Sequence, residues 1–115
     1  MSIHKLTLNH MVEYTLQLDS IFASLSDPTR RDILARVARG ELSVGDLVKS
    51  YEVSFAAISK HLMVMERAKL IVKRKEGRKQ MVSLAPDALK SADEYLEQYR
   101  QVWQGRYDKL DALIT

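Results

Sequence analysis

Residues 54–79 constrain the fold more than any other segment, because a helix-length amphipathic stretch runs there directly into a short basic hairpin. The segment holds eight Lys or Arg and two Glu, a local net charge of +6 on a chain whose formal total is +3. The remainder of the chain therefore sums to −3, so the positive charge is segregated. A helix beside concentrated positive charge is typical of surfaces that contact a phosphate backbone. The pattern predicts a DNA-binding surface.

Capping residues predict where the central helices begin and end. Asp27 followed by Pro28 marks the start of a helix that should reach about residue 38 and end at Gly40. Ser43 caps a short helix and Ser54 a longer one that reaches about residue 68. Because only a few residues connect these last two helices, the sequence predicts a helix-turn-helix over about residues 43–68.

Two β-prone runs follow the helix-turn-helix. They cover residues 71–76 and 79–84 and bracket Gly77, a residue that favours a tight turn. The sequence predicts a two-stranded wing over about residues 71–84.

The helix over residues 54–68 has two distinct faces. At about 100° per residue, one face is apolar and is predicted to pack in the core. The opposite face carries Phe55, Ala56, Ser59, Lys60, Met63 and Arg67. In a helix-turn-helix this outward face enters the major groove, where a serine can bond a base or a phosphate.

Several of these residues have a second interpretation. An exposed Lys60 or Arg67 is ordinarily a solvated surface charge. The basic wing changes this expectation, because like charges crowded around its turn destabilise the fold unless an anion binds them, which favours phosphate contact. His61 lies at the edge of the core face, where a structural histidine is the more common finding. Phe55 and Met63 are outward apolar residues that could instead dock a protein.

Two long helices, over about residues 6–25 and 87–114 with Asp87 as the second cap, carry continuous apolar stripes. In the last helix the stripe advances in alternating steps of three and four residues, as in a coiled coil. A chain of 115 residues is too small to bury both stripes on itself, which predicts a homodimer. The expected interface consists of Leu8, Met11, Leu18, Phe22, Leu89, Leu96, Tyr99, Trp103, Tyr107 and Leu110.

Composition excludes several classes of protein. The chain is 46% apolar and 29% charged, has no cysteine, and contains no apolar run of the roughly 20 residues that a membrane span needs. Its first residues also lack a signal-peptide pattern, so we expect a single cytoplasmic domain over residues 1–115 with no membrane partner. Neither a phosphate-binding glycine loop nor a nucleophile motif is present, which argues against an enzyme.

Three motifs together resemble the ArsR family of winged-helix transcriptional repressors: residues 25–34 (LSDPTRRDIL), residues 59–62 (SKHL) and residues 76–78 (EGR). The resemblance covers nearly the whole chain. It implies a mainly α fold with a two-stranded β wing, a winged helix-turn-helix that dimerises through its first and last helices. The expected DNA contacts are Arg30, Ser54, Phe55, Ala56, Ser59, Lys60, His61, Arg67, Lys73, Arg74, Lys75, Arg78 and Lys79.

The clearest departure from the family concerns metal. Metal-sensing relatives carry two cysteines in the third helix, where this chain has Ser43 and Gly45, and neither residue can bind a soft ion. The last helix, which supplies the other family site, contains no histidine. His4 and His10 are six residues apart and fall on opposite sides of a helix. We therefore expect no metal site and no cofactor.

The sequence predicts a homodimeric repressor that binds a short, approximately palindromic double-stranded operator, including that of its own gene, as similar regulators do. An unidentified small-molecule effector remains compatible with this function. The alternative is a winged-helix protein-interaction module that uses Phe55 and Met63.

Overall fold

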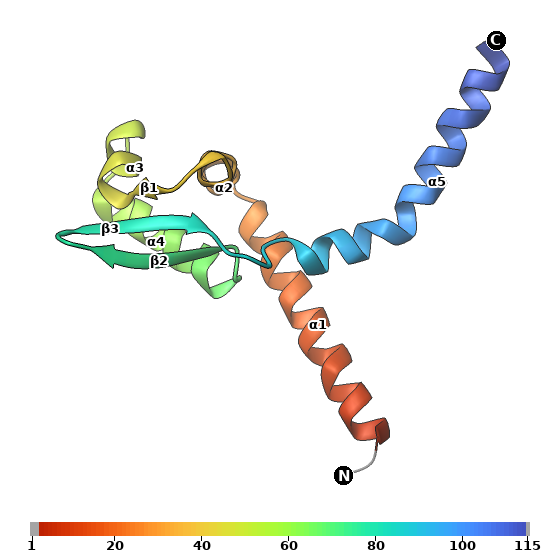
Figure 1. The fold of residues 1–115 in the computed structure, drawn as a ribbon, viewed down its shortest axis with the longest axis horizontal. Helices are drawn as coiled ribbons and strands as arrows, with labels where there is room; N and C mark the ends of the chain where they lie inside the picture. Colours follow the sequence, from red (N-terminus) through yellow and green to blue (C-terminus); the bar gives the residue numbers. More distant parts are fainter. Residues whose placement is uncertain (1–2, 115) are drawn as a thin grey trace.

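The computed structural model describes the backbone of residues 3–114 and the side chains of residues 9–114. Five helices and three short strands follow one another along the described chain (Figure 1). In order they are α1 (Ile3–Leu25), α2 (Pro28–Arg39), β1 (Leu42–Ser43), α3 (Val44–Ser50), α4 (Phe55–Arg67), β2 (Ile71–Glu76), β3 (Lys79–Leu84) and α5 (Lys90–Ile114).

Side-chain caps fix the starts of the three central helices. The carboxylate of Asp27 accepts a hydrogen bond from the backbone N–H of Arg30 at 2.9 Å, and Pro28 occupies the first turn of α2. The hydroxyls of Ser43 and Ser54 each accept a backbone N–H three residues later, both at 3.1 Å. Each cap satisfies an N–H group that has no partner inside its own helix. The predicted starts of α2, α3 and α4 are confirmed.

The β-sheet has three strands rather than the two that the sequence predicted. Strands β2 and β3 form the expected antiparallel hairpin, with Ile71 opposite Leu84 and Glu76 opposite Lys79. Gly77 begins its two-residue loop with φ of 61°, a conformation that glycine adopts without steric cost. The two-residue strand β1 adds to the other side of β3, through Leu42 opposite Val82 and Ser43 opposite Met81.

The core joins the helix-turn-helix to the base of the wing. In α4, Ile58, Leu62 and Met65 are fully buried, as the helical periodicity predicted. The base of the hairpin contributes Ile71 and Val82, whereas the residues near its tip are exposed. The remaining members of the cluster are Ile21, Ile33, Leu34, Val37, Val44, Leu47, Ala68, Leu70 and Ala92. This core fixes the position of α4 relative to the wing.

Helix α5 begins at Lys90, three residues later than predicted. Asp87 lies in a turn, and Leu89 has φ of 66°, so it lies outside the helix. The side chain of Leu89 packs against the core of its own chain. Leu89 therefore does not belong to the exposed stripe of α5, and the predicted interface is corrected at this position.

Helices α1 and α5 extend away from the core in different directions (Figure 1). The radius of gyration is 18.6 Å, whereas a compact chain of this length has a value of about 13 Å. Among the described residues, no helix is long and apolar enough to span a membrane. The protein consists of a packed head, formed by residues 28–84 with the adjoining ends of α1 and α5, and the remainder of these two helices, which projects from it.

Candidate nucleic-acid interface

The outward face of α4 is available to a ligand. Phe55, Lys60 and Arg67 are exposed, and Ser59 is partly exposed between the core face and solvent. Within the described part of the chain, neither Lys60 nor Arg67 has an ion-pair partner. The helix therefore presents a serine, small apolar groups and uncompensated cations on one surface, as its sequence predicted.

The tip of the wing carries a second group of cations. Lys75, Arg78 and Lys79 are exposed, and no described carboxylate forms an ion pair with any of them. Lys79 is opposite Glu76 in the hairpin, whereas Lys75 is opposite Gln80. Because side chains alternate along a strand, Lys75 and Lys79 lie on opposite faces of the hairpin. The tip can therefore meet phosphates on either side of a groove.

Two other wing cations form ion pairs with acidic residues of the same chain. The guanidinium of Arg74 contacts the carboxylate of Glu41 and lies 3.1 Å from that of Glu76. The Glu41 carboxylate raises the pKa of Arg74. Lys73 is partly buried and its amine lies 3.7 Å from the carboxylate of Glu66. These ion pairs tie the wing to Glu41 beside β1 and to α4. Phosphate contact by Arg74 and Lys73 stays a prediction, because the Arg74 side chain is 54% exposed and remains accessible to a ligand.

Arg30 also turns inward, in contrast to its expected place on the DNA surface. Its guanidinium donates to the backbone oxygens of Ser24 at 2.6 Å and Ala23 at 3.2 Å, and lies 3.2 Å from Nδ1 of His61. Asp27 stands beside them, with its carboxylate 3.8 Å from the same imidazole nitrogen. The hydrogen bond from the backbone N–H of Arg30 lowers the pKa of the Asp27 carboxyl. Arg30 and His61 thus belong to an internal polar network.

The acidic partners of Arg74 and Lys73 were not predicted from the sequence. Glu41 precedes β1 and reaches Arg74 across β3, and nothing in its local sequence marks it. Glu66 precedes Arg67 on the exposed side of α4, and nothing in its local sequence marks it as the partner of Lys73. A count of charges within one segment does not reveal these pairs, because Glu41 and Arg74 lie 33 residues apart in the sequence.

The C-terminal half of α1 contacts the first turns of α5. Beyond this contact both helices expose apolar side chains. Tyr95 of α5 packs edge to face on Phe22 of α1 and on Tyr99, with ring centroids 5.7 and 5.5 Å apart. Trp103 is 56% and Leu110 56% exposed. Leu18 is already buried in its own protomer, and the side chain of Leu8 lies outside the described residues. The other predicted stripe residues, Met11, Phe22, Leu96, Tyr99 and Tyr107, are between 42% and 61% exposed.

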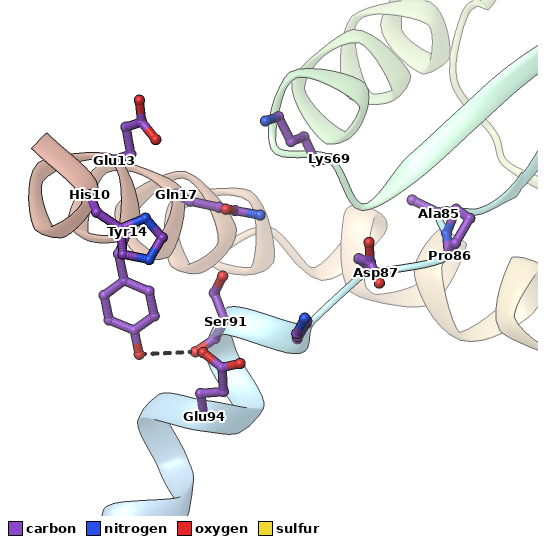
Figure 2. Close-up of a pocket in the computed structure, with 11 residues that line it drawn as sticks. His10, Glu13, Tyr14, Gln17, Lys69, Ala85, Pro86, Asp87, Ser91 and Glu94 are labelled. Atoms are coloured by element: carbon purple, nitrogen blue, oxygen red, sulfur yellow. Dashed lines mark hydrogen bonds between the residues drawn. The ribbon is translucent and has the colours of Figure 1, made fainter. Parts of the chain in front are cut away.

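A polar pocket with a volume of about 520 Å³ lies between α1, the turn after α4 and the start of α5. Figure 2 shows Glu13 and Gln17 on α1, Lys69 across from them, and Asp87 and Glu94 lower in the view. The hydroxyl of Tyr14 donates to the backbone oxygen of Ser91 at 3.3 Å and joins the two long helices beside it. The lining contains both acids and amines, so it suits a small polar molecule rather than an apolar one.

Residues 27–73 match the family described as "Bacterial regulatory protein, arsR family". This range spans α2, the helix-turn-helix and the first residues of the wing.

Individual relatives agree with the family match. The chain is 39% identical over 71 residues to the HTH-type transcriptional regulator Rv2034 of Mycobacterium tuberculosis, a match that covers 62% of this chain and 66%, just under two thirds, of that protein. It is 32% identical to the arsenical resistance operon repressor of Staphylococcus xylosus, over 70% of this chain and 78% of that one. The solved structure of an ArsR-like transcriptional regulator from Rhodococcus sp. RHA1 superimposes with a TM-score of 0.67 at 30% identity, covering 86% of this chain and 93% of that one.

Proposed function

Because the chain belongs to the ArsR family and is therefore a DNA-binding transcriptional regulator, we propose that it represses transcription as a homodimer on an approximately palindromic operator. The observation that carries the proposal is the outward face of α4 beside a wing tip whose three cations have no described acidic partner. Binding of DNA phosphates to such a surface is favourable in free energy, because it releases the counterions held by DNA.

Dimerisation is proposed from the stripe on α1 and α5. Large apolar and aromatic residues on these helices stay about half exposed in one protomer, and a continuous stripe of this size is unusual for a monomer. A second copy offers an identical stripe, and a two-fold interface is self-complementary. The two-fold axis would place two α4 helices about one turn of DNA apart on a palindrome.

Helix α4 and the wing have different roles in this proposal. Ser59 lies where a hydroxyl can contact a base edge or fix the register on a phosphate, whereas Lys75, Arg78 and Lys79 contact phosphates of any sequence.

The two roles predict different responses to alanine substitution. Ser59→Ala should weaken operator binding more than non-specific binding, by about 1 kcal/mol for each hydrogen bond lost. Arg78→Ala should weaken binding to both DNAs alike and lower the log–log salt slope by about 1 for each protomer. Fluorescence anisotropy on both DNAs across a salt series measures these effects. Equal losses from Ser59→Ala, or a selective loss from Arg78→Ala, would show that the roles are exchanged.

We also propose that regulation does not use a transition metal. At the third-helix position where metal-sensing relatives have cysteines, this chain uses the Ser43 hydroxyl to cap α3 and has Gly45 two residues later. A hydroxyl and a glycine offer no ligand to a soft ion. Isothermal titration with zinc, cadmium and arsenite should show no stoichiometric binding tighter than about micromolar. A tighter site that also changes operator affinity would contradict this prediction.

Phe55 and Met63 give the interaction-module alternative little support. They are eight residues apart on α4, which separates their Cα atoms by about 12 Å along the helix axis. Two side chains at that distance do not form one compact apolar patch. The pocket beside α1 and α5 is the place to test small polar molecules as effectors, because it touches both long helices and Lys69 in the turn after α4.

A further inference from the structure

Arg30 connects two helices whose relative position matters for DNA binding. It lies in the first turn of α2 and donates to the backbone oxygens of Ala23 and Ser24, near the end of α1. Its third contact is to Nδ1 of His61, in the middle of α4. One side chain thus bridges the end of the proposed dimerisation helix and the helix that faces the groove.

The chemistry of this contact determines where the imidazole carries its proton. A guanidinium has only donors, so the nitrogen 3.2 Å from it must offer a lone pair. When the ring carries one proton, this contact requires that proton to be on Nε2. The Asp27 carboxylate lies 3.8 Å from Nδ1, too far for a hydrogen bond, and instead caps α2.

The contact restrains α4 about its own axis. Side chains on a helix end about 5 Å from the axis, so a rotation of about 20° moves the tip of Ser59 by roughly 2 Å. A displacement of that size breaks a hydrogen bond to a base. His61 is two positions from Ser59 and partly buried, with 23% of its side chain exposed. It is therefore well placed to add a directional restraint to the core packing that already holds α4.

We propose that Arg30 is a positioning residue that orients the recognition helix by holding the His61 imidazole as its Nε2–H tautomer, rather than a residue that contacts DNA. This inference rests on the proposed binding of DNA by α4. The proton placement can be measured without DNA, so its failure is distinguishable from failure of the proposed function.

The first test is the imidazole nitrogen spectrum of the free protein at a pH of about 8.5, where an ordinary histidine is neutral. His61→Asn identifies the signals of His61 among the three histidines. We expect a single Nε2–H tautomer in the wild type, and a shift toward a mixture of tautomers in Arg30→Met, which keeps the length of the stem but removes the donors. An Nδ1–H tautomer, or identical spectra in the two proteins, would overturn the proposal.

The second test is a double-mutant cycle on operator affinity. Arg30→Met and His61→Leu should each reduce it about tenfold and change non-specific binding by less than about twofold, and the double variant should lose little more than either single one. His61→Asn retains an acceptor oxygen near the position of Nδ1 and should stay within about threefold of the wild type. Additive losses of about a hundredfold, accompanied by a smaller salt slope, would make both residues direct DNA contacts and overturn the proposal.

Discussion

Replacing Leu110 by Asp is expected to convert the protein into a folded monomer. Leu110 is 56% exposed in the protomer and is not part of its core, so the substitution leaves the head intact. In a two-fold dimer it would place a carboxylate from each copy in the apolar interface, at a cost of roughly 5 kcal/mol or more. The dimer dissociation constant should rise by more than about 10³. Leu96→Asp, at 50% exposure on the same stripe, should behave alike.

Sedimentation equilibrium checks this result, with circular dichroism as the test of folding. The Leu110 variant should sediment as a 13.2 kDa protomer with unchanged helical content. Gln101→Asp is the matched control, because its side chain is exposed on the side of α5 opposite the stripe and should leave the dimer unaffected. Intact dimers in both Leu96→Asp and Leu110→Asp would place the interface elsewhere.

Reversing two charges at the wing tip should have the largest effect on DNA binding. Lys75→Glu with Lys79→Glu removes two phosphate contacts from each protomer, one on each face of the hairpin. Four contacts of somewhat under 1 kcal/mol each correspond to a loss of about a hundredfold on operator and non-specific DNA alike. The slope of log affinity against log salt should decrease in magnitude by about 4 for the dimer.

The control for this variant carries the same change in net charge away from the wing tip. Lys90→Glu with Lys109→Glu places both substitutions on exposed positions of α5. We expect much less than a tenfold change in affinity and a nearly constant salt slope, because neither lysine lies on the outward face of α4 or at the wing tip. Equal effects of the two pairs would mean that overall charge, rather than the wing, drives binding.

Local chemistry made the helix boundaries predictable. Asp27, Ser43 and Ser54 are short polar residues directly before apolar helical periodicity, and each caps a helix in the structure. The wing was predictable for a similar reason, since Gly77 separates two β-prone runs and adopts the positive φ that its turn requires.

Features that depend on distant partners were not predictable. Strand β1 has only two residues, which is too short for a sequence periodicity. It forms because β3 lies beside it. Helix α5 begins at Lys90 because the preceding residue, Leu89, packs against the core with a positive φ. The same limit applies to charge, because the sequence identifies Arg30 and Arg74 as cations but not the tertiary partners that engage them.

The most direct test of the central claim is a selection of mixed genomic fragments by the wild-type protein, followed by hydroxyl-radical footprinting of the bound DNA. We expect one class of fragment to bind with a stoichiometry of one dimer, and two protected half-sites related by a dyad and separated by about one helical turn. Selectivity over competitor DNA should persist as salt is raised, although both affinities fall. Binding without any preferred fragment, or a single protected half-site per protein, would contradict a dimeric regulator that recognises its operator through α4.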